Sequence, residues 1–163
     1  MKILLVHIFI IFSLILSVSK VNGQKIEYIK VPELEKILKN PDDKLFVINL
    51  WATWCAPCVA ELPAFEKTAG EYDKSKVKFL MVSLDFPSQI EKQLKPFLLK
   101  NKITLDVAVM MDVDYDSWIS LVDPQWQGNI PATLIFNNKA KIRYFHSGEL
   151  SEAELRNLLN KFL

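Results

Sequence analysis

The chain has 163 residues, which is the size of a single domain. Half of its residues are hydrophobic and 24% are charged, and this composition excludes a collagen-like or intrinsically disordered chain. Its formal charge of +1 argues against nucleic-acid binding, because proteins of that class need a basic surplus to displace counterions from phosphates.

The N-terminal segment has the pattern of a secretory signal. Lys2 is followed by an apolar run over residues 3–18 that is interrupted by one histidine and two serines. We expect a signal peptide over residues 1–23 and a domain over residues 24–163 that is exported, for example to the periplasm. Cleavage after Ser19 is an alternative. An uncleaved membrane tether is another, since the apolar run is just short of the ~20 residues that span a bilayer.

The first elements of the domain alternate between strand and helix. A short strand is expected over Lys25–Lys30. Pro32 suits the first turn of a helix that ends before Asn40-Pro41. Lys44–Trp51 is almost continuously apolar, and this pattern predicts a central strand that is buried on both faces.

The middle of the chain continues the alternation. A helix is expected from about Pro57 to Lys74, with a bend at Pro63. Val77–Leu84 is a second buried-strand pattern. Ser88–Asn101 is helical by its periodicity, and Pro96 must either kink this helix or begin a second one.

The C-terminal third predicts a hairpin between two helices. A strand is expected over Leu105–Met111, and a short helix over Asp114–Val122. Ala132–Phe136 and Lys141–His146 flank Asn137-Asn138, a pair that favours a tight turn between two strands.

Ser151 and Glu154 form a capping-box pattern that opens the last helix. The series of strand–helix–strand units, ending in a hairpin and a helix, predicts one α/β domain. Its central mixed β-sheet should be flanked by helices on both faces.

The only two cysteines, Cys55 and Cys58, lie where the most apolar strand turns into a helix. Unpaired N–H groups at a helix N-terminus stabilise a thiolate, so Cys55 is predicted to be an exposed, reactive sulfur. Cys58 follows one helical turn later and can close a disulfide, while Pro57 suits the first helical position. These features indicate a thiol–disulfide exchange site.

Two other interpretations of the cysteine pair remain open. A structural disulfide across two intervening residues closes too small a loop to stabilise a fold much. A metal site would need further ligands, and the predicted domain offers no third cysteine and only His146.

The residues around the cysteine pair, together with a second segment near residue 130, resemble a known family. Val47–Cys58, followed by Glu61-Leu62-Pro63, is similar to the thioredoxin superfamily, and more narrowly to exported TlpA/ResA-like thiol–disulfide oxidoreductases of bacteria. Gly128–Thr133 resembles the cis-proline loop of that superfamily. The resemblance covers roughly residues 25–163 and implies a thioredoxin fold. The 46 positions from Asp85 to Pro131 leave room for an αβ insertion before the cis-proline loop.

The resemblance also implies substrate-binding residues. Pro131 is expected to be cis and to lie beside the cysteines, leaving the backbone of Ile130 free to pair with an extended substrate segment. Trp54 is expected to flank the reactive sulfur and to contact a partner protein. Together with Pro57, these are the predicted substrate-binding residues.

Glu61 is the third predicted catalytic residue, after the two cysteines. It lies one helical turn after Cys58, and burial there would raise the pKa of its carboxyl group, so that it could exchange a proton with Cys58. Minimal thioredoxins carry a buried aspartate six positions before the first cysteine of the motif, where this chain has Asn49, which cannot titrate. The alternative is an ordinary solvated carboxylate.

The remaining candidates favour structural roles. Trp51 is expected in the core, and Trp126 either lines a docking groove or packs as an ordinary aromatic residue. His146 is predicted to be structural or on the surface. Asp112 and Asp114 suggest a solvated loop rather than a metal site.

The predicted function is an exported thiol–disulfide oxidoreductase that reduces protein disulfides, as the resemblance implies for cytochrome c maturation or thiol repair. Its partners would be protein clients and an upstream electron donor, and it would be a monomer that needs no cofactor or metal beyond the Cys55–Cys58 disulfide. Two alternatives stay open. One is a redox-sensing or binding module without turnover, and the other is a copper chaperone, for which His146 is a poor ligand candidate.

Overall fold

A computed structural model describes residues 26–163 of the chain. The predicted signal peptide or membrane tether lies outside these residues. Among the helices described within 26–163, none is both long enough and apolar enough to cross a membrane.

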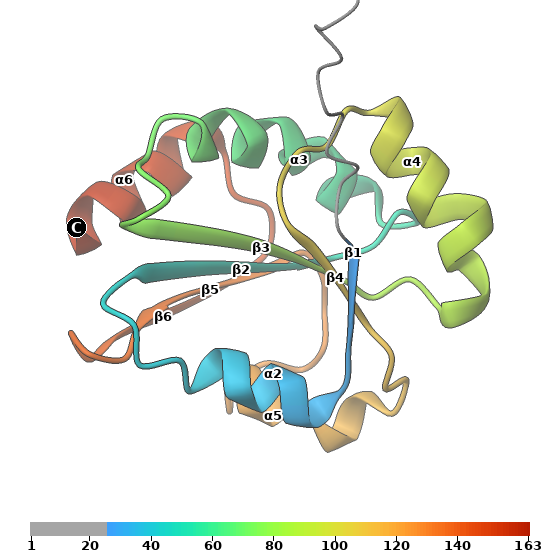
Figure 1. Ribbon diagram of the computed structural model, residues 1–163, viewed down its shortest axis with the longest axis horizontal. Coiled ribbons are helices and arrows are strands. Elements are labelled where there is room, and N and C mark those ends of the chain that lie inside the picture. The colour runs from blue at the N-terminus through green and yellow to red at the C-terminus, as the bar shows by residue number, and fades with distance from the viewer. Residues whose placement is uncertain (1–25) are drawn as a thin grey trace, which may run out of the picture.

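A single mixed sheet forms the centre of the molecule (Figure 1). Its strands are β1 (Ile26–Ile29), β2 (Leu45–Trp51), β3 (Val77–Ser83), β4 (Val107–Met110), β5 (Ala132–Asn137) and β6 (Ile142–Ser147). They lie in the order β1-β4-β3-β2-β5-β6. The first four are parallel to one another, whereas β5 is antiparallel to both β2 and β6. The predicted mixed sheet is confirmed.

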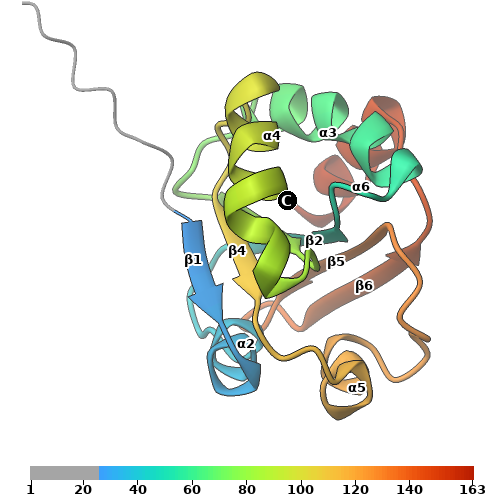
Figure 2. The same cartoon turned by 90° about the vertical axis from the view of Figure 1, so that its right-hand side faces the viewer.

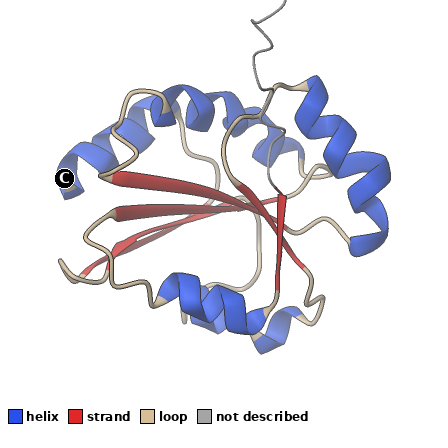
Figure 3. Ribbon diagram, in the orientation of Figure 1, coloured by secondary structure: helices blue, strands red, loops and turns tan. Residues whose placement is uncertain are grey.

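Helices cover both faces of this sheet (Figures 1 and 3). The helices are α2 (Val31–Leu38), α3 (Ala56–Ala69), α4 (Lys95–Lys100), α5 (Ile119–Val122) and α6 (Glu152–Phe162), with short 3₁₀ or π turns at Pro87–Gln89, Ile90–Leu94 and Tyr115–Ser117. Helices α3, α4 and α6 lie over one face, and α2 and α5 lie under the other. Each face therefore has its own hydrophobic core.

Strand β2 supplies both cores, and every one of its residues is buried. Val47 and Trp51 pack on the side of α3, whereas Phe46, Ile48 and Leu50 pack on the opposite side. This alternation is the period-2 geometry of a strand with a helical layer on each face. The predicted central strand is confirmed.

The predicted αβ insertion adds α4 and β4 (Figure 2). Pro96 is the second residue of α4, and helical backbone continues into α4 from the π-helical segment Ile90–Leu94 that precedes it. Pro96 therefore lies within one helical segment whose geometry changes next to the proline, and it does not begin a separate helix. Strand β4 lies between β1 and β3 in the sheet. The insertion therefore widens the sheet by one internal strand.

Helix α3 is shorter than predicted, because it ends at Ala69 and not at Lys74. Contacts with α6 engage the residues that follow it. Glu71 accepts two hydrogen bonds from Arg156, and the hydroxyl of Tyr72 donates to Asn160 over 2.8 Å. Helix α3 itself closes at Gly70, whose N–H donates to carbonyl oxygens of the preceding turn.

The helix predicted over Asp114–Val122 is also divided. It forms a 3₁₀ turn and then α5, separated at Trp118. The indole of Trp118 is fully buried, donates to the carbonyl oxygen of Asp112 over 3.0 Å and packs on Trp126. The backbone of Trp118 (φ −142°, ψ −13°) is neither helical nor extended, and the helix is interrupted where this large side chain is buried.

The turn between β5 and β6 is longer than the predicted tight turn at Asn137-Asn138. Asn137 remains in β5, and the side-chain oxygen of this residue accepts the N–H of Ala140 over 2.9 Å. Asn138 donates to the carbonyl oxygens of Leu38 and Asn40. The side chain of Asn137 thus bonds within the turn, and that of Asn138 bonds to the segment after α2. The two residues do not form the centre of a two-residue turn.

The last helix begins as predicted. The Ser151 hydroxyl accepts the N–H of Glu154, and the Glu154 carboxylate accepts the N–H of Ser151 over 2.9 Å. Leu155 and Leu159 are buried against the sheet. The capping box therefore fixes where α6 starts, directly after the segment that contributes Leu150 to the candidate site.

Candidate active site

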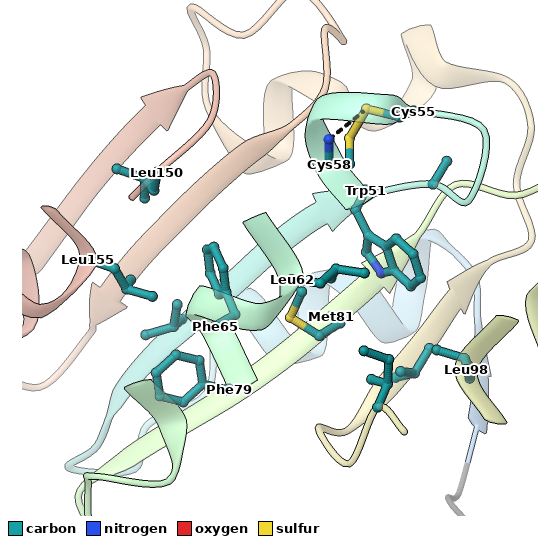
Figure 4. Packing of buried hydrophobic residues seen from close by; sticks show 14 of the residues in the cluster. Trp51, Cys55, Cys58, Leu62, Phe65, Phe79, Met81, Leu98, Leu150 and Leu155 are labelled. Atoms are coloured by element: carbon teal, nitrogen blue, oxygen red, sulfur yellow. Dashed lines mark hydrogen bonds between the residues drawn. A yellow bond between two sulfur atoms is a disulfide. The ribbon is translucent and has the colours of Figure 1, made fainter. Parts of the chain in front are cut away.

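Cys55 and Cys58 form a disulfide at the N-terminus of α3 (Figure 4). Cys55 is the N-cap residue, and the sulfur of Cys55 accepts the backbone N–H of Cys58 at 3.3 Å. The prediction of an exposed sulfur is wrong as stated, since Cys55 is only 6% exposed and Cys58 is fully buried. The core side chains beneath the disulfide, including Trp51, account for this burial. Cys55 is still the more accessible of the two residues.

Glu61 lies one turn further along α3 and is 2% exposed. Burial raises the pKa of its carboxyl group to about 7, and the charge of Glu149 acts in the same direction. Two hydrogen bonds oppose this shift, from the N–H of Leu150 at 2.8 Å and from the amide of Asn49 at 2.7 Å. The predicted burial and raised pKa are confirmed, and a solvated carboxylate is excluded.

Asn49 connects Glu61 to the sheet. Its amide nitrogen donates to Glu61 and to the hydroxyl of Thr133, at 2.7 and 3.1 Å. Its amide oxygen is buried and has no hydrogen-bond partner within residues 26–163. Asn49, which cannot titrate itself, therefore donates a hydrogen bond to Glu61, the carboxyl group whose pKa is raised.

The Ile130–Pro131 peptide bond is cis, as predicted. Pro131 is buried, and its carbonyl oxygen accepts the N–H of Gly148 at 2.9 Å. The half-buried Ile130 borders a groove that Trp54 also lines. The loop before β5 and the loop before α3, which are far apart in the sequence, thus meet at one end of the sheet.

This groove has a volume of about 400 Å³ and a largely apolar wall. Its lining residues are Trp54, Leu84, Phe86, Gln89, Tyr115, Gly128 and Ile130. Trp54 is 54% exposed and Phe86 is 47% exposed, a large exposure for aromatic side chains. The groove next to the disulfide therefore offers two open aromatic surfaces.

Other predicted residues take structural positions. Trp51 is fully buried, as expected. Trp126 is buried among aromatic side chains and donates to the carbonyl oxygen of Asn129 at 2.8 Å, so the groove-lining alternative is wrong. His146 lies on β6, near the carbonyl oxygen of Glu149. Pro57 is exposed and is the second residue of α3, one position later than predicted.

The structure shows no cluster of three or more metal-ligating side chains between residues 26 and 163. Asp112 uses its carboxylate to accept the N–H of Val31 at 2.8 Å, which is a structural contact.

The sequence analysis missed several residues around the groove, above all Asp85. This residue is buried and accepts hydrogen bonds from Thr53, the neighbour of Trp54. One signal could have identified it. Asp85 directly follows the apolar run of a predicted parallel strand, and the carboxyl ends of parallel strands form the edge where binding sites gather.

The comparisons with known proteins agree with this geometry. The model of the AhpC/TSA family matches residues 21–145. The chain belongs to the AhpC/TSA family. Its thioredoxin-like members are the ones that it resembles, as the following relatives show.

The curated relatives carry the names of a thioredoxin-like protein and of thiol–disulfide oxidoreductases. The chain is 28% identical over 126 residues to the thioredoxin-like protein YneN of Bacillus subtilis, covering 76% of this chain and 68% of that protein. It is 25% identical to the thiol-disulfide oxidoreductase ResA of Halalkalibacterium halodurans, covering 71% of this chain and 60% of ResA. It is 26% identical to the sporulation thiol-disulfide oxidoreductase A of B. subtilis, covering 68% of this chain and 63% of the relative. The chain thus spans about two thirds of the length of these relatives.

Solved structures show the same fold. A thioredoxin-related protein from Neisseria meningitidis serogroup B is 25% identical, with a TM-score of 0.62 over 72% of this chain and 83% of that one. StoA from B. subtilis has a TM-score of 0.56 at 23% identity, covering 72% of this chain and 84% of StoA. The predicted thioredoxin fold and the family resemblance are confirmed.

Proposed function

We propose that the protein is an exported thiol–disulfide oxidoreductase that reduces protein disulfides through Cys55 and Cys58. The observation that carries this proposal is the disulfide itself. It closes the first turn of α3, its more accessible cysteine lies at the helix N-terminus, and Glu61 is buried one turn further on. The names of the relatives belong to the same class of enzyme.

In the reduced protein, Cys55 is the attacking sulfur. The N–H of Cys58 points at the sulfur of Cys55, and the positive end of the α3 dipole adds to this stabilisation of a thiolate. The thiolate attacks one sulfur of a client disulfide and forms a mixed disulfide, and the other client sulfur leaves as a thiolate. Cys58 then attacks Cys55. This step closes the Cys55–Cys58 disulfide and releases the second client sulfur, so two electrons pass to the client.

Glu61 accepts the proton of the Cys58 thiol in this scheme. Cys58 must lose its proton before it attacks, and a carboxylate with a pKa of about 7 accepts a proton at neutral pH. The buried position of both residues on α3 keeps the exchange away from bulk water.

Clients are proposed to bind across the cis-proline loop. Neither the N–H nor the carbonyl oxygen of Ile130 has a hydrogen-bond partner in the described part of the chain, so both can pair with an extended segment. Pro131 has no N–H that would compete for the same acceptor. Trp54, which lines the same groove as Ile130, and Pro57 offer exposed apolar surface next to the two cysteines in the chain.

The cellular role follows from the same features. The N-terminal segment, residues 1–23, would direct export, with residues 3–18 as a tether if they are retained. The protein would act as a monomer between an upstream electron donor and protein clients, in cytochrome c maturation or thiol repair. The redox-active disulfide is the only reactive group that this scheme requires.

The test is reduction of insulin disulfides by the purified domain with dithiothreitol as the electron source. Catalysis above the dithiothreitol background is expected, and it should disappear in Cys55→Ser. Cys58→Ser should accumulate mixed disulfides with its clients, which identifies them. A strongly oxidising potential in equilibrium with glutathione would contradict the reductase direction.

A further inference from the structure

Asp85 lies at the end of β3, beside the loop that carries the redox motif. The N–H of Leu84 donates to the carbonyl oxygen of Trp51 at 2.8 Å and so continues the pairing of β3 with β2 up to this point. Asp85 is 1% exposed, which is unusual for a carboxylate. A buried carboxylate has to be compensated by hydrogen-bond donors.

The donors come from two residues. Both carboxylate oxygens of Asp85 accept the N–H of Thr53, at 3.2 and 3.1 Å, and one of them also accepts the Thr53 hydroxyl. The Ser83 hydroxyl donates to the other oxygen at 2.8 Å and itself accepts the N–H of Asp85 at 3.1 Å. Thr53 is therefore held by its backbone and by its side chain.

These bonds fix the turn that precedes Cys55. The N–H of Cys55 donates to the carbonyl oxygen of Ala52 at 3.2 Å, so Thr53 and Trp54 form the outer part of a tight turn. The side chain of Trp54 extends from this turn, is exposed, and lines the groove.

The opposite side of the groove depends on the same carboxylate. Phe86, which also lines the groove, is the next residue after Asp85. Tyr115 lines it as well, and burial together with the charge of Asp85 raises the pKa of its phenol, which places the two groups near each other. Asp85 is thus linked to Trp54 through Thr53, adjoins Phe86 in the chain and lies near Tyr115.

We propose that Asp85 is a positioning residue for protein clients, because it fixes the aromatic walls of the groove, Trp54 through Thr53 and Phe86 through the adjoining backbone. This proposal rests on the proposed function and adds a determinant of client binding to it. Asp85 does not take part in the exchange between sulfurs. Small disulfides that do not fill the groove are therefore reduced without its help.

A carboxylate suits this task better than an amide of the same size. Each of its oxygens accepts hydrogen bonds, and both receive the N–H of Thr53. In Asp85→Asn an NH₂ group replaces one of the two oxygens. This NH₂ group cannot accept a hydrogen bond, and it faces the donors of Thr53 or Ser83. The turn at Thr53 is then held by fewer and weaker bonds.

The experiment compares two substrates, insulin and hydroxyethyl disulfide, in the wild type and three variants. In Asp85→Asn and Thr53→Val, kcat/KM for insulin should fall by roughly fivefold or more, mainly through KM. The rate with hydroxyethyl disulfide should stay within about twofold of the wild-type rate. Thr53→Ser is the matched control, since it keeps both donors and should retain most of the insulin activity.

The outcomes separate the two proposals. Equal losses on both substrates, or no loss on insulin, would overturn the assignment of Asp85 while leaving the proposed function intact. A wild-type protein that fails to reduce either substrate would overturn the proposed function. If Asp85→Asn does not fold, as judged by thermal unfolding, the Thr53→Val and Thr53→Ser pair decides the question alone.

Discussion

Two buried carboxylates lie on either side of β2, and they serve different purposes. Glu61 is linked to β5 and to the start of α6 through Asn49 and the N–H of Leu150. Asp85 is linked to the redox-motif loop and to β3 through three donor groups, two from Thr53 and one from Ser83. The two are almost equally hidden from solvent. Both accept a backbone N–H, but that of Asp85 belongs to the loop before Cys55, whereas that of Glu61 belongs to the segment before α6. Glu61 in turn lies on α3, one turn after Cys58.

The largest expected difference between the two carboxylates is that Glu61 makes the free energy of unfolding depend on pH. Its pKa rises from 4.5 to about 7 on folding, so the neutral acid is favoured in the folded protein. The stabilisation is complete below about pH 4.5 and is lost as the pH rises through about 7. Relative to Glu61→Gln, the oxidised wild type should lose about 3 kcal/mol of unfolding free energy between about pH 4 and about pH 8. Urea unfolding across this range measures the difference.

Parallel stability curves for the two proteins would show that Glu61 does not titrate in this way. Glu149→Gln is the control for the surrounding charge. The charge of Glu149 raises the pKa of Glu61, so its removal should move the transition slightly toward lower pH.

The second effect concerns the rate of exchange. Removal of the proton acceptor in Glu61→Gln should slow the attack of Cys58 on the mixed disulfide by about a hundredfold near neutral pH. The rate of the wild type should rise with pH through about 7, and this rise should be absent from the variant. Stopped-flow measurement with a preformed mixed disulfide isolates this step. Equal rates and equal pH profiles would restrict Glu61 to a structural role.

The smallest effect tests the connection from Glu61 to the sheet. Thr133→Val removes one of the two acceptors of the Asn49 amide, and should lower the unfolding free energy by about 1 kcal/mol. Thr68→Val is a matched control within α3, because the hydroxyl of Thr68 is buried without a hydrogen-bond partner in the described chain. Its replacement should be neutral or stabilising. A loss in Thr68→Val as large as in Thr133→Val would mean that the hydrogen bond is not the cause.

Features set by local pattern could be predicted from the sequence. The apolar run of β2, the capping box at Ser151 and the spacing of Cys55 and Cys58 each determine a structure within a few residues. The burial of Glu61 was also predictable, because it lies one turn after the inward-facing Cys58. Local periodicity and helix-end chemistry are sufficient in these cases.

Features set by distant contacts could not be predicted. The contacts of Glu71 and Tyr72, just after α3, are made with Arg156 and Asn160, which lie more than 80 residues away in the sequence. The break at Trp118 depends on the packing of a large side chain. Asp85 is the instructive case at the site, since its importance arises only when β3 lies beside the motif loop. Its position after an apolar strand marks it as a candidate, but its contact with Thr53 cannot be read from a local pattern.

The order of the strands restricts how another polypeptide reaches the cysteines. The strand that leads into Cys55, β2, is paired with β3 on one side and with β5 on the other, and β1 and β6 are the outermost strands of the sheet within residues 26–163. An incoming chain cannot extend the sheet at β2, and it has to approach end-on, over the carboxyl ends of the parallel strands β2 and β3 and the amino end of β5. Lateral association of two copies through β1 or β6 would leave that entrance open.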